Sequence, residues 1–246
     1  MATAAKGKHI LLENLWLPMA REAGESFFPK LRKNKKMRVF TLTDESNCEE
    51  ISLMIEANLT TGEAVFGWTS SMFKKARLET YREPINVIGA TRFEDCITSN
   101  STAIEEYFPF DILIMDFSSQ NSESYPGRIE KEMISLELTI KAQKDRISNK
   151  KGFLLIYTTK LNTQPIHTCS IKTNSDGFIV HRWAGLNING LPSTATIPNE
   201  KSRVIKAFVD QLPKKYGFRL TASSKTHEAK TVDEHLFSIA VTFEVM

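Results

Sequence analysis

The segment 107–117 reads YFPFDILIMDF, and its second half is a run of apolar residues that ends in the acid Asp116. A continuous apolar run of this kind is typical of a strand that is covered on both faces of a parallel sheet. Similar runs rich in Val, Ile, Leu and Phe occur at residues 37–42, 64–68, 85–89, 153–158, 217–220 (extending toward 222) and 236–245. The chain is therefore predicted to form a sheet of about seven strands.

The sequence between these runs has the spacing of helices. Residues 128–147 place apolar side chains three and four positions apart, and shorter stripes of the same kind predict helices at 49–59 and 201–216. We expect Pro213 to interrupt the last of these, and we expect only a weak helix at 21–32, which contains a glycine and a proline. Strands that alternate with helices indicate right-handed βαβ units and an α/β fold.

The composition excludes several classes of protein. The chain has 246 residues, of which 41% are hydrophobic and 25% charged, so it is not wholly disordered, collagen-like or a disulfide scaffold. No apolar run reaches the roughly 20 residues of a membrane helix, and we expect no membrane partner. Three widely spaced cysteines indicate reduced thiols and a cytoplasmic or nuclear location.

We expect one domain over residues 1–246, with a helical extension at 1–36 and an insert at 160–199 near the functional site. Within the insert, SIKTNSDGFIVHRW (170–183) predicts a hairpin with its turn at Asp176 and Gly177. The insert also contains two histidines and a cysteine, but no closely spaced pair of ligands, so no metal site is predicted.

The order of these elements resembles that of the class I S-adenosylmethionine-dependent methyltransferases over about residues 20–246. YFPFDILIMDF (107–117) is similar to the fourth strand of that family, NKKGFLLIYTT (149–159) to the fifth, and KKYGFRL (214–220) with HLFSIAVTFEV (235–245) to the closing antiparallel pair. The resemblance implies a seven-stranded, mostly parallel sheet in a three-layer sandwich, with a C-terminal antiparallel hairpin.

Ligands of such sheets bind outside the carboxyl ends of the strands, where the strand order reverses. The resemblance implies S-adenosylmethionine as the cofactor at this edge, held by residues that follow the first four strands: Thr43, Asp44, Thr69, Ser70, Thr91, Glu94, Asp95, Phe117 and Ser118. The chain departs from the family after the first strand, where TLTDESNCEE (41–50) contains no glycine, and after the second, where hydroxyls replace an acid. Glu94 and Asp95 can instead begin a helix, and Thr43 to Ser46 can cap one.

Asp116 is the predicted catalytic residue, because a carboxylate at the end of the fourth strand can orient a nucleophile or take its proton. The alternative is that it caps the strand and bonds the amides of residues 117–119. If Asp116 lies at a solvent-facing strand end, Asp116→Ala should leave the fold intact and lower methyl transfer by about 10²-fold, with a much smaller change in cofactor affinity. The following segment, DFSSQ (116–120), lacks the Pro-Pro-aromatic pattern of enzymes that methylate base amines.

Two functions from different classes remain open. The first is an S-adenosylmethionine-dependent methyltransferase acting on RNA or another nucleic acid. The second is a catalytically inactive methyltransferase-fold binding or scaffold subunit of a complex, which the missing glycine-rich turn favours. A third, weaker option is a nucleotide-binding enzyme with another cofactor. A basic run is predicted to contact the phosphates of a nucleic acid; its members are Lys30, Arg32, Lys33, Lys35 and Lys36. Three aromatic residues near this run, Trp16, Phe27 and Phe28, either stack on bases or lie in the core.

Overall fold

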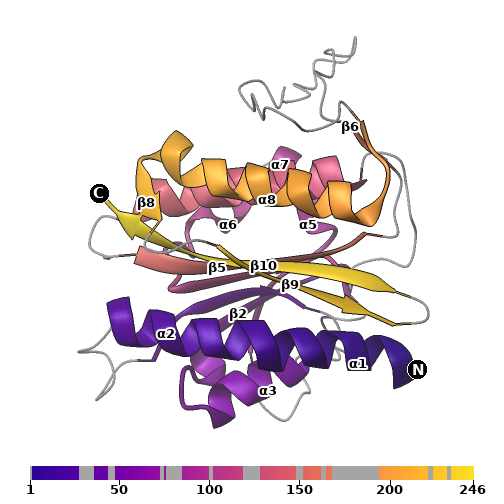
Figure 1. The fold of residues 1–246 in the computed structure, drawn as a ribbon. Helices are drawn as coiled ribbons and strands as arrows, with labels where there is room; N and C mark the ends of the chain where they lie inside the picture. The colour runs from indigo at the N-terminus through magenta and orange to yellow at the C-terminus, as the bar shows by residue number, and fades with distance from the viewer. Residues whose placement is uncertain are drawn as a thin grey trace.

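A computed structural model of the chain has one large sheet with helices on both faces (Figure 1). The structure describes residues 2–27, 36–43, 48–72, 75, 85–99, 102–118, 128–147, 152–161, 165–167, 194–220, 224–231 and 234–246. The hairpin predicted at 170–183 lies outside the described residues, as do Asp44 and most of the basic run at 30–36.

The sheet has the strand order β3-β2-β1-β4-β5-β10-β8. Its five parallel strands are β1 (Val39–Leu42), β2 (Val65–Thr69), β3 (Asn86–Ala90), β4 (Ile112–Asp116) and β5 (Gly152–Lys160). The last strand, β10 (His235–Val245), runs antiparallel to β5 and fills the place beside it. The predicted fold class, an α/β sheet with a mostly parallel core and antiparallel C-terminal strands, is confirmed.

The outer edge of β10 is shared by two short strands. β8 (Phe218–Leu220) pairs with the last residues of β10, and β9 (Lys225–Lys230) pairs with its first half. Because β5 occupies the other edge of β10 along residues 236–244, β8 and β9 together take one position in the sheet. The sheet therefore has seven positions, as predicted, although β9 was not foreseen.

The helices form two layers, one on each face of the sheet (Figure 1). One layer contains α1 (Ala2–Leu11), a π-helical segment η1 (Leu12–Trp16), α2 (Leu17–Phe27) and α3 (Cys48–Glu56). The other layer contains α5 (Phe93–Ser99), α6 (Thr102–Glu105), α7 (Arg128–Arg146) and α8 (Pro198–Tyr216). Smaller elements are the 3-10 turn η3 (Gly62–Ala64) and the strand pair β6 (Ile166–His167) and β7 (Thr194–Ala195).

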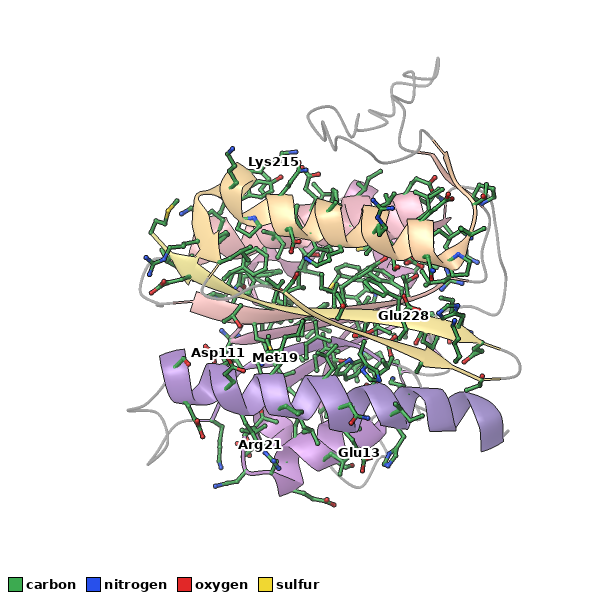
Figure 2. The ribbon with its side chains drawn as sticks, in the orientation of Figure 1. Glu13, Met19, Arg21, Asp111, Lys215 and Glu228 are labelled. Atoms are coloured by element: carbon green, nitrogen blue, oxygen red, sulfur yellow. The ribbon has the colours of Figure 1, made fainter. Side chains whose placement is uncertain are left out.

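Each face of the sheet has its own core, because side chains alternate along a strand. In β4, Ile112 and Ile114 pack toward the N-terminal helix and α3, whereas Leu113 and Met115 pack toward α7 and α8. Figure 2 shows the side chains that fill both spaces between the sheet and the helices. This double coverage explains why β4 reads as a continuous apolar run.

The N-terminal helix begins much earlier than the weak helix predicted at 21–32, within the helical extension expected at 1–36. α1, η1 and α2 follow one another without a break from Ala2 to Phe27, in place of the weak helix predicted at 21–32. The helix lies across the sheet with Met19 on the sheet side and Arg21 on the far side (Figure 2). Its register is fixed in the core, since Trp16 is fully buried and its Nε1 donates to Ser238 Oγ at 2.9 Å. The core interpretation of Trp16 is therefore correct.

The helix α8 also differs from the prediction, because it continues through Pro213 to Tyr216. A proline removes one backbone hydrogen bond and usually breaks a helix interior. Here Pro213 lies in the last turn and is buried, and the helix ends at Gly217, which has φ 67° and donates its N–H to the Pro213 carbonyl. The apolar contacts of the last turn and the glycine cap explain why α8 does not stop earlier.

None of the described helices combines the length and the apolarity that a membrane crossing requires.

Candidate functional site

The strand order reverses at β1, which has β2 on one side and β4 on the other. The chain passes from β1 through α3 to β2, and it later crosses from β3 through α5 and α6 to β4 on the opposite side. In α/β sheets the crevice at this point, outside the carboxyl ends of the strands, is where ligands bind. The fold therefore favours a ligand site at the carboxyl ends of β1 and β4.

A line of polar residues crosses five strands at this carboxyl edge. Asp116 is opposite Thr158, and Thr158 is opposite Ser238. If the register of β1 with β2 and β4 is extended by one or two residues, Thr43 lies beside both Thr69 and Asp116. The Thr43 N–H donates to the Trp68 carbonyl at 2.8 Å, which agrees with this extended pairing. We call these residues the polar row; in spatial order they are Thr69, Thr43, Asp116, Thr158 and Ser238.

The polar row is buried and faces the N-terminal helix. All five of its residues are completely inaccessible to solvent. Because side chains alternate, Asp116 points to the same face of the sheet as Ile112 and Ile114, which pack in the core under the N-terminal helix and α3. The same face is thus apolar along most of the strands and becomes polar only at their carboxyl ends.

Lys8 of α1 and Glu50 of α3 complete a charged cluster over the centre of the row. Lys8 Nζ lies 2.7 Å from Asp116 Oδ2 and 3.3 Å from Glu50 Oε2, and both carboxylates are essentially inaccessible. The Lys8 ammonium also lies 5.5 Å from the centre of the Trp16 ring, within the range of a cation–π interaction. One ammonium thus lies within ion-pair distance of two buried acids that come from different elements.

Asp116 is not at a solvent-facing strand end, and that expectation was wrong. The N-terminal helix lies over this edge and places Lys8 against one carboxylate oxygen. The other oxygen, Oδ1, accepts hydrogen bonds from the Ser118 N–H at 3.0 Å and from the Ser118 hydroxyl at 2.5 Å. Asp116 therefore does cap the strand end, as the alternative interpretation holds, at least toward Ser118.

The hydroxyl groups of the polar row differ in whether they have hydrogen-bond partners among the described residues. Ser238 Oγ accepts from Trp16 Nε1, and it lies 2.7 Å from Thr158 Oγ1. Thr69 Oγ1, in contrast, has no hydrogen-bond partner within the described part of the chain. A buried hydroxyl without a partner costs free energy, so the Thr69 end of the row has hydrogen-bonding capacity that the described residues do not use.

The surroundings of Glu50 alter its pKa strongly. Burial raises the pKa of Glu50 to about 7, the Lys8 ammonium opposes the rise, and the neighbouring Asp116 carboxylate adds to it. The main physical cause is the cost of removing a negative charge from water. At neutral pH the cluster therefore lies close to the point where Glu50 gains or loses its proton.

A second buried network lies on the other face of the same sheet edge. Glu132 of α7 accepts from Arg128 Nε at 2.7 Å, from the Tyr157 hydroxyl at 3.0 Å and from Thr159 Oγ1 at 2.6 Å, while Arg128 also donates to the Phe117 carbonyl at 2.6 Å. Burial raises the pKa of Glu132 against the opposing effects of Arg128 and Thr159, and it raises the pKa of Tyr157 well above its usual range. These contacts fasten the start of α7 to β5.

The structure brings four of the predicted site residues together. Thr43, Thr69 and Asp116 all belong to the polar row, and Ser118 bonds to Asp116. Phe117 points to the opposite face, where its ring packs 5.8 Å from that of Tyr157.

The residues predicted after the third strand are separated from the row. Glu94 lies on the α7 side of the sheet, and burial raises its pKa. Asp95 is exposed and pairs with Lys131 of α7 at 3.7 Å. Both are in the first turn of α5, so the helix-start interpretation of these acids is confirmed. Thr91 is exposed, and its carbonyl accepts from Trp68 Nε1, while Ser70 is half-buried beyond the end of β2.

Sequence reasoning missed Lys8, Glu50, Thr158 and Ser238. Alternation could have found the last two, since Thr158 follows Leu154 and Ile156 on one face of β5, and Ser238 lies between Leu236 and Ala240 on one face of β10. Lys8 was also detectable, because it extends the helical stripe that continues with Leu11, Leu12, Leu15 and Trp16. A lysine on the buried stripe of a helix indicates a buried anionic partner.

No family model matches the chain, and no curated protein matches its sequence. The sheet itself supports the resemblance, because five parallel strands in the order 3-2-1-4-5, followed by antiparallel strands, form a Rossmann-like arrangement consistent with the class I methyltransferases. A fold of this kind can bind a nucleotide-like cofactor at its carboxyl edge.

Proposed function

We propose that the chain is an S-adenosylmethionine-dependent methyltransferase whose cofactor lies at the carboxyl ends of β1, β2 and β4. The observation that carries this proposal is the polar row with the charged cluster of Lys8, Glu50 and Asp116 at its centre. The row lies where the strand order reverses, which is the place that the fold offers to a ligand.

Energetics favour a functional role for this cluster. Three buried ionisable groups are expensive to desolvate, and well-packed apolar residues in their place often make a protein more stable. A sheet that served only as a scaffold would gain by continuing the apolar face of Ile112 and Ile114 to the strand end. Groups that are buried, charged and shifted in pKa concentrate at functional sites instead.

The residues of the row fit the groups of the proposed cofactor. S-adenosylmethionine carries a sulfonium and an ammonium cation at one end and ribose hydroxyls at the other. Asp116 and Glu50 supply anions for the cationic end, and the Thr69 hydroxyl supplies a partner for the ribose. Glu94 lies on the other face of the sheet, so we do not assign it to the adenine.

When bound, S-adenosylmethionine supplies an electrophilic methyl group. The chain's own residues would bind the cationic end at Asp116 and Glu50, orient the methyl group toward the acceptor and exclude water from the row. Positioning of two reactants in this way accounts for much of the rate that such enzymes provide. The burial of Asp116 fits a binding role, while proton transfer to it remains a prediction.

Replacing Asp116 by asparagine tests the proposal. Asparagine retains an oxygen for the Ser118 N–H and a similar volume, so we expect Asp116→Asn to fold. Loss of the negative charge should weaken S-adenosylmethionine binding by about tenfold or more and lower methyl transfer by about 10²-fold. Calorimetry measures the first effect and transfer of a labelled methyl group the second.

Asp111 provides the matched control. It is a buried aspartate just before the other end of β4, where its Oδ2 accepts from the Arg38 N–H at 2.7 Å (Figure 2). Asp111→Asn should leave binding and transfer unchanged. If a folded Asp116→Asn variant also behaves like the wild type, the cofactor does not lie at the polar row.

The alternative function, a catalytically inactive binding or scaffold subunit, is favoured by one specific observation. The Lys8 ammonium already lies between the two carboxylates, and the loop after β1 contains no glycine to allow a close approach. Calorimetry at millimolar S-adenosylmethionine separates the functions. Absence of heat with both the wild type and a Lys8→Met variant would support the alternative, as would co-purification with a stoichiometric partner.

A nucleic acid is the proposed methyl acceptor, supported by the basic run at residues 30–36. The one described residue of that run is Lys36, and its ammonium donates to the Asn58 carbonyl at 3.2 Å, so it also ties down the chain before β1. Binding of a single-stranded RNA oligonucleotide should weaken steeply as salt rises, because phosphate contacts release counterions. Fluorescence anisotropy at several salt concentrations measures this, and binding that is absent or insensitive to salt would contradict it.

A further inference from the structure

The cation that neutralises the charged cluster comes from the N-terminal helix, not from the sheet. Lys8 Nζ is the described positive charge within ion-pair distance of both Asp116 and Glu50. Neither oxygen of Glu50 accepts a hydrogen bond from the described residues, although both are buried. Glu50 thus has a charge partner in Lys8 but spare acceptor capacity with respect to the described residues.

Among the described side chains of the N-terminal helix, the continuous apolar stripe begins after Lys8. From Leu11 onward the helix buries a continuous apolar stripe, whose members are Leu11, Leu12, Leu15, Trp16, Met19, Ala20 and Ala23. Among residues 7–10, Gly7 is buried close to Thr231 and Ile10 is only partly buried, while Lys8 makes the ion pairs. Of these four residues, Lys8 is therefore the one whose charge attaches α1 to the polar row.

A change in helical geometry separates these two parts. Residues Leu12–Trp16 form the π-helical segment η1, between α1 and α2. π-helical turns inside α-helices occur frequently at functional sites, and they are among the few places where helices bend sharply. The structure therefore offers a point at which α1 can move while α2 stays in the core.

We propose that Lys8 is a built-in competitor, whose ammonium holds the place of a cationic group of the ligand between Asp116 and Glu50, and that ligand binding releases α1 from the edge of the sheet. The ligand class is a compound with an ammonium or sulfonium group. The identification of that compound as S-adenosylmethionine rests on the proposed function.

Exchange of one cation for another explains why such a competitor would be needed. Loss of the Lys8 ammonium would remove the cation that pairs with both buried carboxylates, and breaking a buried ion pair in this way is destabilising. Lys8 removes that cost in the free protein, and an incoming cation removes it in the complex. A neutral ligand cannot make this exchange. The hydroxyl of Thr69, buried on the same face without a partner in the described chain, gives the ligand a second contact in the row.

The competition has a measurable consequence. The apparent affinity of a ligand is reduced by the fraction of molecules in which the site is closed. Removal of the Lys8 ammonium should therefore strengthen the binding of cationic ligands by at least about tenfold, the factor that corresponds to one charge-assisted contact. Binding of a neutral ligand should not change.

The experiment is calorimetry on the wild type, Lys8→Met and the control Lys225→Met. Methionine keeps the unbranched stem of lysine and removes only its charge. Lys225 also pairs with the N-terminal helix, at 2.7 Å from Glu22, but both side chains are about half exposed. Four probes are used: S-adenosylmethionine, S-methylmethionine, which has both cations but no nucleoside, S-adenosylhomocysteine, which lacks the sulfonium charge, and adenosine, which has no cation.

The outcomes distinguish the two proposals. Tighter binding of S-adenosylmethionine and S-methylmethionine to Lys8→Met only, with adenosine unchanged, supports both. If Lys8→Met binds S-methylmethionine more tightly but S-adenosylmethionine does not bind at all, the proposed role of Lys8 is supported and the proposed methyltransferase function is overturned. Equal affinity of S-adenosylmethionine for the wild type and Lys8→Met overturns the competitor and keeps the methyltransferase. No binding of any probe to any variant overturns both.

A second measurement guards against a variant that does not fold. Circular dichroism tests whether Lys8→Met folds. If it does not fold, the double variant Lys8→Met/Glu50→Gln takes its place, because it has one buried negative charge fewer and retains Asp116. Hydrogen exchange gives an independent readout in the wild type. Saturating S-methylmethionine should accelerate exchange in residues 2–10 and leave residues 15–23 protected. Unchanged protection of residues 2–10 in the ligand complex would overturn the release of α1.

Discussion

Glu132→Ala is expected to lower the free energy of unfolding by about 3–5 kcal/mol, the usual result of breaking a buried ion pair by removing one partner. The alanine would take away the carboxylate that neutralises Arg128, and with it the acceptor for the Tyr157 and Thr159 hydroxyls. All four side chains are almost completely buried, so water cannot replace the lost contacts. Urea denaturation followed by circular dichroism measures the loss.

Two further variants separate charge from hydrogen bonding. Glu132→Gln can still bond both hydroxyls but leaves Arg128 without its counter-charge, so its loss of stability should be intermediate. Asp95→Ala removes an exposed carboxylate of α5 that pairs with Lys131 of α7. It should change the free energy of unfolding by less than about 1 kcal/mol. A Glu132→Ala variant as stable as Asp95→Ala would show that the network does not fasten α7 to the sheet.

Glu50→Gln should give a stability difference from the wild type that depends on pH. The pKa of Glu50 is raised to about 7 in the folded protein, where it faces Lys8 from α1 and Asp116 from β4. A raised pKa means that the folded state holds its proton more tightly than the unfolded chain. The stability contributed by Glu50 is therefore complete below its unfolded pKa of about 4.5 and is lost as pH rises through about 7.

The glutamine variant cannot lose that proton and should not show the decline. Relative to the difference at pH 5, Glu50→Gln should gain up to about 3 kcal/mol over the wild type by pH 8. Urea denaturation at a series of pH values measures this gain. Glu22→Gln, which alters an exposed glutamate of α2, is measured beside it for comparison. A difference for Glu50→Gln that stays constant with pH would mean that the pKa of the Glu50 carboxyl is not raised by folding.

The parallel strands were predictable because burial on both faces leaves a plain signature in sequence. β4 was expected at 111–117 and is Ile112–Asp116, and α7 was expected at 128–147 and is Arg128–Arg146. β9 was missed because it is an edge strand: Lys225–Lys230 reads KTHEAK and is largely exposed, with only Ala229 buried. Pairing with β10 makes it a strand, and this pairing leaves no apolar pattern.

The helix around residue 24 was underestimated because Gly24 and Pro29 were weighed by propensity alone. A side chain at Gly24 would make an ordinary contact with Met37, whereas one at Gly7 would come within 3.2 Å of Thr231, so Gly7 allows the helix to lie close to its neighbour. Tertiary contacts of this kind routinely override local preference.

The candidate site was half predictable. Thr43, Thr69 and Asp116 follow from the rule that ligands bind at the carboxyl ends of strands, which needs only the strand positions. Lys8 and Glu50 could not be assigned to Asp116 from sequence, because nothing local says which helix lies over which strand end. Glu94 and Asp95 were assigned by analogy with the family, and the facing of α5 toward the other side of the sheet separates them from the row.

The hydrogen bond between Trp16 and Ser238 joins residues 222 positions apart. Contacts between such distant parts of a chain form slowly, because a long loop must close before they contribute any stability. During synthesis the segment with Lys8 and Trp16 appears early, whereas the strand with Ser238 appears after β1 to β5. The carboxyl edge therefore cannot be completed stepwise with the parallel strands, and an assembled polar row marks a chain that has finished folding.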